Sequence, residues 1–116
     1  MLIVINDIPP SNNKFIGRNM IFQYQEEKKK WHWLVKAAIK DKPQSAIIKA
    51  RITLTYYFKS KTRRDPDNFS GKMLLDPLVR EGIIVDDCFD YIELVLKCQY
   101  DKVNPRTEIL IEEVLK

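Results

Sequence analysis

The segment from Ile48 to Phe58 constrains the fold most, because apolar and polar side chains alternate along it as far as Tyr56. The apolar members are Ala50, Ile52, Leu54, Tyr56 and Phe58. The polar members are Lys49, Arg51, Thr53 and Thr55. Successive side chains of a strand point to opposite faces of its sheet. The alternation therefore predicts a strand over 48–58 with one buried face, and this strand leads the chain into a polar segment.

The other expected elements alternate between strands and helices. They are a strand over 2–8, helices over 19–40 and 68–81, and strands over 92–98 and 107–114. Pro9-Pro10 ends the first strand because proline cannot donate to a ladder, and Trp31 is the expected core residue of the first helix. The order β-α-β-α-β-β predicts an α/β (α+β) fold with a mixed four-stranded sheet and two helices. A chain of 116 residues fits one domain, 1–116.

Cysteine and histidine usage argues against a zinc site. Cys88 and Cys98 have no CxxC spacing, and the lone His32, to which we assign no role, is far from both in sequence. Two reduced thiols are typical of the cytoplasm. The amino end lacks the basic region of a signal peptide, and no apolar run approaches the length of a membrane span. We expect a cytoplasmic protein with no membrane partner.

Basic residues are concentrated directly before an acidic group. Lysine and arginine exceed aspartate and glutamate by 20 to 16, a net charge of +4, which alone is weak evidence for a nucleic-acid partner. The basic run, Lys59, Lys61, Arg63 and Arg64, falls within six residues and leads into Asp65. Such cations hold a polyanion near carboxylates that would otherwise repel it. A solvated charged loop is the alternative and stays open at this point.

The acidic group is the run Asp65-Pro66-Asp67-Asn68. If the chain is extended here, both carboxylates project to one side, and Pro66 favours extended geometry at Asp65. Two carboxylates with open water positions suit Mg²⁺, for which Mn²⁺ can substitute. Such an ion lowers the pKa of a bound water and polarises a phosphoryl oxygen. The run therefore predicts a metal site that acts on phosphate.

Further polar residues follow at helical spacing. Asn68, Lys72 and Asp76 form one stripe if the helix begins at Asn68, and Lys72 would then lie near the metal. An exposed Lys72–Asp76 ion pair is the alternative. Asp86 and Asp87 follow the helix and converge on Asp65 if the chain folds back.

An EF-hand loop has a similar beginning but does not match. Phe69 stands where an oxygen ligand belongs, and Ser70 replaces the required glycine. A calcium loop is therefore excluded.

These motifs together resemble the signature of RusA-type Holliday-junction resolvases, over nearly the whole chain and in the family's order. The matching elements are Pro9-Pro10-Ser11-Asn12-Asn13-Lys14, Arg63-Arg64-Asp65-Pro66-Asp67-Asn68, Lys72, Asp76-Pro77-Leu78, Gly82 and Asp86-Asp87. The interval from Asp67 to Lys72 is one residue longer than in the best-known member, with Gly71 as the extra residue.

The resemblance implies a homodimer that resolves four-way junction DNA by paired symmetric nicks in recombination and repair. It implies Mg²⁺ ligands at Asp65, Asp67 and Asp87, with Lys72 assisting cleavage. Asp87 rather than Asp86 is chosen by alignment alone, and Asn68, Asp76 and Asp86 are supporting residues. The expected DNA contacts are Lys14, Arg18, Arg51, Lys59, Lys61, Arg63 and Arg64.

Two other functions remain open at this point. One is a junction- or DNA-binding module with little catalysis, although intact aspartates near phosphate would only weaken such a binder. The other is a metal-dependent nuclease of other branched or duplex DNA, which the residues do not separate from a resolvase.

Overall fold

The computed structural model describes residues 1–17 and 19–114. Its sheet contains β1 (Leu2–Ile5), β2 (Ala50–Phe58), β3 (Ile92–Tyr100) and β4 (Arg106–Glu113). The spatial order is β1-β4-β2-β3, with β2 and β3 parallel and the other two pairs antiparallel. The predicted mixed four-stranded sheet is confirmed.

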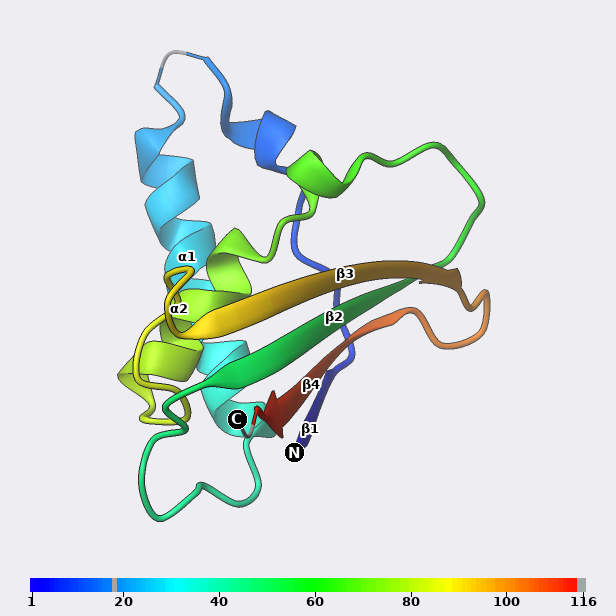
Figure 1. The fold of residues 1–116 in the computed structure, drawn as a ribbon. Helices are drawn as coiled ribbons and strands as arrows, with labels where there is room; N and C mark the ends of the chain where they lie inside the picture. Colours follow the sequence, from blue (N-terminus) through cyan, green and yellow to red (C-terminus); the bar gives the residue numbers. More distant parts are fainter. Residues whose placement is uncertain (18, 115–116) are drawn as a thin grey trace.

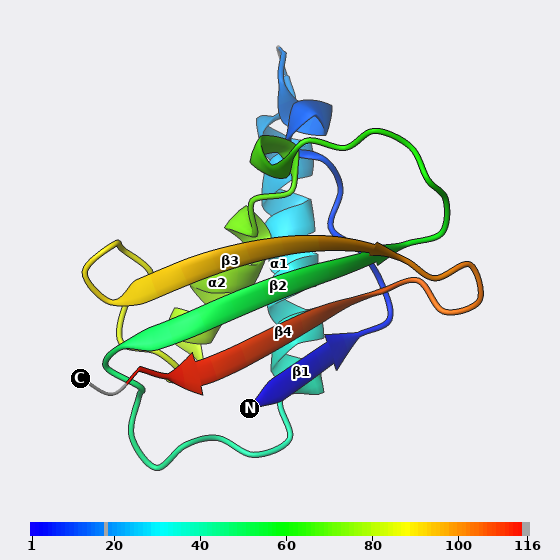
Figure 2. The same ribbon diagram turned by 45° about the vertical axis from the view of Figure 1, so that its right-hand side comes forward.

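Two helices cover one face of this sheet (Figures 1 and 2). They are α1 (Ile21–Ala38) and α2 (Lys72–Arg80), which pack against each other, and α2 lies on the crossover between the parallel strands β2 and β3. The predicted order of strands and helices is confirmed, so the chain is a single α+β domain. No helix among the described residues is long and apolar enough to cross a membrane.

The core lies between the helices and the inner face of the sheet. The predicted apolar face of β2 is buried along its whole length, as its alternating burial shows. Trp31 and Val35 of α1 are fully buried against it, together with Leu74 and Leu78 of α2. The predicted role of Trp31 as a core residue is confirmed.

The second helix begins later than predicted. Pro66–Asn68 forms a separate 3₁₀ turn, η2, and Gly71 then adopts φ +83° before α2 starts at Lys72. A Cβ on Gly71 would overlap Cδ1 of the fully buried Leu54. Only glycine combines a positive φ with so close an approach. Gly71, the extra residue in the motif, is therefore the position at which the chain turns before α2 begins.

Strand β3 lies at the edge of the sheet, and its inner face is only partly covered. Its register with β2 places Leu94 beside Ile52 and Leu96 beside Leu54, so the predicted shared face of β3 is confirmed. Leu94 is nevertheless 37% exposed, whereas its neighbour Ile52 is fully buried. The helices therefore cover the central strands fully and this edge strand only in part, with Ile92 and Leu96 still packed against the core.

Candidate functional site

The acidic run forms a surface turn at the end of the loop that follows β2. Asp65 is extended, and its carbonyl accepts the N–H of Asn68 across the 3₁₀ turn η2. The backbone is therefore not extended through Asp67, and the prediction that strand alternation directs both carboxylates to one side is wrong. Both aspartates are exposed on this turn, which we call the acid turn (residues 65–68).

Aromatic packing holds the acid turn against the sheet. Phe69, directly after it, packs edge-on against Tyr56 and Phe58 of β2, with ring centroids 5.8 and 5.1 Å apart. On the preceding side, the Arg64 guanidinium stacks 3.9 Å from the centroid of the Phe58 ring. One aromatic cluster thus anchors the residues on both sides of the acid turn to β2.

The amino-terminal motif is tied to the same turn. The Asn12 side-chain amide donates to the backbone carbonyl of Asp67 at 2.9 Å and to Oγ of Ser70 at 3.1 Å. Asn12 opens η1 (Asn12–Phe15), which Ser11 caps through its hydroxyl. Two segments more than fifty residues apart in sequence are thereby joined. Sequence reasoning noted the motif but missed this link, because no periodicity signals it.

Lys72 follows the acid turn closely in sequence but does not lie on a helical stripe with Asn68. Gly71 separates the two residues, so the predicted stripe of Asn68, Lys72 and Asp76 is wrong. Lys72 begins α2 and places its ammonium 5.3 Å from the centroid of the Tyr24 ring. It lines a hollow of about 190 Å³ with Asn12, Phe15 and Tyr24. Because Asn12 contacts the acid turn directly, Lys72 and the turn share one neighbourhood.

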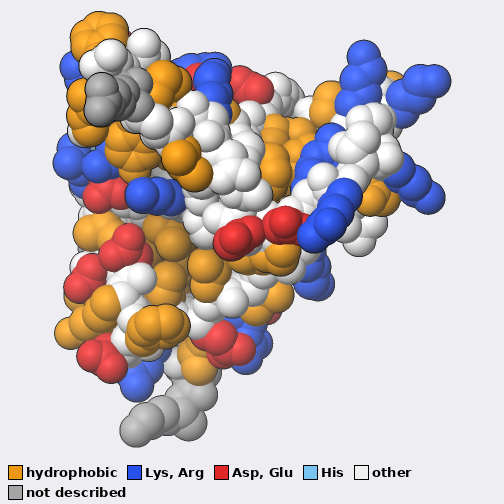
Figure 3. All heavy atoms as spheres, turned by 90° about the horizontal axis from the view of Figure 1, so that it is seen from above, with side chains coloured by type: hydrophobic (Ala, Val, Ile, Leu, Met, Phe, Trp, Pro, Cys, Tyr) orange, Lys and Arg blue, Asp and Glu red, His pale blue; other side chains and the backbone are white. Residues whose placement is uncertain are grey.

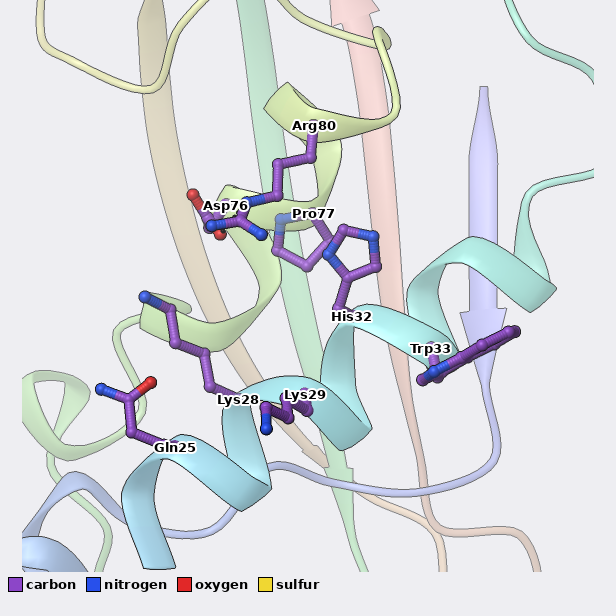
Figure 4. A pocket seen from close by; sticks show the side chains of 8 residues that line it. All are labelled: Gln25, Lys28, Lys29, His32, Trp33, Asp76, Pro77 and Arg80. Atoms are coloured by element: carbon purple, nitrogen blue, oxygen red, sulfur yellow. Dashed lines mark ion pairs between the residues drawn. The ribbon is translucent and has the colours of Figure 1, made fainter. Parts of the chain in front are cut away.

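Asp76 makes a different ion pair from the one considered in the sequence. Its carboxylate pairs with Arg80 Nε at 3.0 Å, one turn along α2, instead of with Lys72. Figure 4 shows Arg80 bending back along the helix toward Asp76. Asp76 and Arg80 both line the hollow between the two helices.

Asp86 and Asp87 are held near the opposite end of β2. The Val85 N–H donates to the carbonyl of Ile47, which precedes the start of β2, whereas the acid turn packs on the end of that strand. Within residues 1–17 and 19–114, no three acidic, histidine or cysteine side chains are gathered closely enough to hold a metal. The structure thus brings Asp65 and Asp67 together on one turn and does not bring Asp87 to them.

The two adjacent aspartates have different surroundings. Asp86 is half-buried, and its carboxylate accepts the Asp87 N–H at 2.8 Å. Asp87 is exposed. Asp86 thus has a local capping contact, and Asp87 has the more accessible carboxylate.

The predicted basic contacts fall into two groups. Lys59, Lys61 and Arg63 are exposed in the loop before the acid turn, and Arg63 Nε lies 3.3 Å from the Asp65 carboxylate. Figure 3 shows Lys and Arg side chains projecting from one corner, with acidic side chains at their base. Arg51 is different: it pairs with Glu93 at 3.4 Å, and seven residues of strand, roughly 23 Å, separate it from the end of β2.

The remaining predicted contacts lie at the amino-terminal segment. Lys14 is exposed on η1, 5.8 Å from the centroid of the Phe15 ring, and therefore lies on the element that contacts the acid turn. Arg18 lies outside the described residues.

A second basic surface was missed by sequence reasoning. A hollow of about 390 Å³ lies between α1 and α2, and Figure 4 shows the residues that line it. Its cations are Lys28, Lys29 and Arg80, and the exposed Trp33 stands beside them. The consecutive residues Lys28-Lys29-Lys30 were the available signal.

His32, at the same hollow, has a structural contact. Its Nε2 lies 3.0 Å from the Glu81 carboxylate, which Lys42 also contacts at 3.0 Å. Hydrogen bonds from these two partners, Lys42 first and His32 second, hold the pKa of Glu81 below its ordinary value. The assignment of no role to His32 is therefore incomplete, because it joins α1 to the end of α2.

Comparison of the chain with family models and with curated proteins finds no match. The geometry of the acid turn and its surroundings is therefore the basis for a functional interpretation.

Proposed function

We propose that this chain is a divalent-metal-dependent, structure-selective DNA endonuclease that resolves Holliday junctions as a homodimer. One observation carries the proposal: two exposed carboxylates lie on a turn anchored by aromatic packing, directly after a loop of exposed cations, and Asn12 links this turn to the hollow that Lys72 lines. The residue resemblance supplies the substrate, four-way junction DNA. Reduced Cys88 and Cys98 are consistent with action in the cytoplasm.

The acid turn fits a hard divalent cation. Asp65 and Asp67 would hold Mg²⁺ or Mn²⁺, which commonly takes one or two protein carboxylates and completes its shell with water and substrate phosphate. When bound, such an ion lowers the pKa of a coordinated water and polarises the phosphoryl oxygen. Asn12 contributes by fixing the backbone at Asp67.

The cations of the chain have separate tasks in this proposal. Lys59, Lys61 and Arg63 would bind backbone phosphates, which offsets the repulsion between DNA and the aspartates. Lys72, at the start of α2, would place a positive charge where the pentacovalent phosphate develops negative charge. Arg64 acts indirectly, since its stacking on Phe58 orders the loop that carries the other cations.

A binding module with little catalysis is the second candidate. The separation of Asp86 and Asp87 from the acid turn favours it, because only two carboxylates are then available to a metal. A nuclease of flaps or duplex DNA is a further alternative. The same experiment separates all three.

The test is incubation of the protein with a synthetic four-way junction, a flap and a linear duplex, each with Mg²⁺, Mn²⁺ or EDTA. We expect paired nicks in the junction only, and only with metal. Junction binding without cutting under any metal condition would establish the binding module, and preferential cutting of flap or duplex would establish the other nuclease.

Variants of the acid turn sharpen this test. Asp67→Asn should abolish cutting while junction binding is retained or strengthened, because a metal ligand and a negative charge near phosphate are both removed. Asp41→Asn, an exposed aspartate beyond α1, is the matched control and should cut normally. A folded Asp67→Asn protein that loses junction binding together with cutting would contradict the assigned role.

A further inference from the structure

Within the described residues, β3 is an edge strand, and its outer side offers an ordered row of unpaired backbone groups. The Ala50 N–H donates to the Tyr91 carbonyl, and the Asp101 N–H donates to the Phe58 carbonyl. Odd-numbered residues of β3 therefore bond to β2, and even-numbered residues direct N–H and C=O outward. This edge is nine residues long, and such an edge is a ready template for pairing with another strand.

The side chains along this edge are unusual for one left open to water. On the helix side, Leu94 is 37% exposed and Leu96 is half-buried, so apolar surface is left partly uncovered. On the opposite face, Glu93 and Lys97 are both exposed, and Glu93 pairs with Arg51 of β2 at 3.4 Å. A lysine on an edge strand normally discourages pairing, unless the pairing partner presents a carboxylate to it.

We infer that β3 pairs antiparallel with β3 of a second copy of this chain, about a two-fold axis at Val95. In this register Glu93 lies opposite the partner's Lys97, and Lys97 lies opposite the partner's Glu93. Leu94 lies opposite the partner's Leu96, and the reverse pair repeats it. The seam thus joins opposite charges on one face and leucines on the other.

The backbone is consistent with this register. Residues 94 and 96 both direct their hydrogen-bonding groups outward, so they form a hydrogen-bonded pair. Val95 then meets the partner's Val95 in a non-hydrogen-bonded pair, where side chains approach most closely. The two four-stranded sheets would become one continuous sheet.

Neighbouring registers lose the charge pairing. Moving the axis to Leu96 places Lys97 opposite the partner's Val95. Moving it to Leu94 places Glu93 opposite the partner's Val95. Of these three axes, only the one at Val95 satisfies both charges in both copies.

The seam would also bring the two acid turns close to one symmetry axis. A small hollow of about 60 Å³ separates Asp65 and Pro66 from Leu96 and Cys98 of β3. Each acid turn therefore flanks the edge strand of its own copy. A two-fold pair of sites suits matched nicks in two strands, so this inference rests on and deepens the dimer of the proposed function.

Charge exchange tests the seam without DNA or metal. By sedimentation equilibrium, the wild-type protein should be a dimer, and Glu93→Lys and Lys97→Glu should each weaken association by roughly tenfold, because each creates two like-charge pairs. The double variant should restore most of the association, since it exchanges the charges within each pair, although Glu93→Lys also removes the contact with Arg51. Lys40→Glu, an exposed charge change beyond α1, should have no effect.

Cysteine placement tests the register. In a background of Cys88→Ser and Cys98→Ser, Val95→Cys should form an intermolecular disulfide on mild oxidation. Leu94→Cys and Leu96→Cys should crosslink much less, because neither residue meets its own copy across the axis. Circular dichroism confirms that each variant is folded.

A monomeric wild-type protein would overturn the inference. So would a dimer that ignores both charge changes and does not crosslink at Val95, because its interface would then lie elsewhere. Neither readout depends on cutting, so failure of the dimer seam and failure of the nuclease proposal are separately visible.

Discussion

Two arginines stack on consecutive aromatic residues of β2 and end in opposite electrostatic situations. Arg64 lies 3.9 Å from the centroid of the Phe58 ring, and Arg106 lies 3.7 Å from that of Tyr57. Consecutive strand residues face opposite sides of the sheet, so the two arginines lie on opposite faces. The stacking is the same, and the remaining partners differ.

Arg106 is neutralised by two carboxylates. Its guanidinium contacts Asp101 at 2.8 Å and Glu108 at 2.7 Å. The Asn104 N–H and then Arg106 hold the pKa of Asp101 below its ordinary value. The positive charge of Arg106 in the turn between β3 and β4 is therefore balanced by neighbouring carboxylates.

Arg64 instead donates to backbone carbonyls of Ser60 and Thr62, at 2.8 and 3.2 Å. These contacts order the loop without neutralising it, so Lys59 and Lys61 remain exposed cations beside the acid turn. The same arginine–aromatic stacking therefore has two different consequences. Arg106 meets carboxylates, so the charges of its turn balance, whereas Arg64 meets backbone carbonyls, so its loop stays positively charged.

The largest expected effect comes from substitution of Gly71, the residue between the acid turn and α2. Gly71→Ala should destabilise the fold by roughly 2–4 kcal/mol, because a Cβ meets buried Leu54 and the positive φ is strained. Urea unfolding followed by circular dichroism measures this. Gly82→Ala, with φ +74° and no atom within 4 Å of the added Cβ, should cost only about 1 kcal/mol. Equal losses would show that packing at Gly71 is not the cause.

The comparison of the two arginines predicts that one substitution affects only stability and the other affects only DNA binding. Arg106→Ala should lower the melting temperature by several degrees and leave junction affinity unchanged, because it leaves Asp101 and Glu108 without their cation. Arg64→Ala should lower junction affinity and leave the melting temperature nearly unchanged, because the loop loses its order. Thermal melts and binding titrations on both variants check this. Similar behaviour of the two variants would break the comparison.

A smaller effect is expected from single cations. Lys61→Ala should reduce the slope of log affinity against log salt concentration by about 1, because one phosphate contact is lost. The exposed Lys102, in the turn between β3 and β4, is the matched control, and its alanine variant should keep the wild-type slope. Titrations at several salt concentrations measure both slopes, and an unchanged slope for Lys61→Ala would remove it from the contacts.

The smallest effect concerns Glu81, whose carboxylate contacts both His32 and Lys42. Its side chain is 11% exposed between His32 and Lys42, which hold its pKa below the ordinary value. Stability from these contacts is present above the unfolded pKa and is lost as pH falls through the folded one. Glu81→Gln should therefore cost about 1 kcal/mol at neutral pH and less below about pH 4. Unfolding curves across this range measure the difference, and a pH-independent cost would argue against the ionic contacts.

Much of the fold followed from local pattern. The alternation in 48–58 predicted the buried face of β2, and helical spacing predicted that Trp31 enters the core; both are confirmed. The exact ends of the helices and strands were harder to predict from the sequence. The first strand ends at Ile5 rather than at residue 8, since a bend at Asn6 and Asp7 precedes the prolines.

The candidate site was predictable only within short segments. Asp65 and Asp67 were identified from their spacing, but the continuous helical stripe through Asn68 was wrong. Gly71 could be read as a helical residue or as a break, and only its distance from Leu54 decides which. The link from Asn12 to Asp67 depends on a contact across fifty-five positions, for which sequence offers no period.

The sequence by itself determined the order of elements, the inner face of the central strand and the position of the carboxylates after a basic loop. These are local properties, because side-chain periodicity and turn residues act within a few positions of one another. For the described residues, the tertiary structure alone decided that Arg106 meets carboxylates while Arg64 meets backbone carbonyls, that Asp87 lies away from the acid turn, and that β3 is an edge strand. Those outcomes depend on strand order and register, which bring together residues that are distant in the chain.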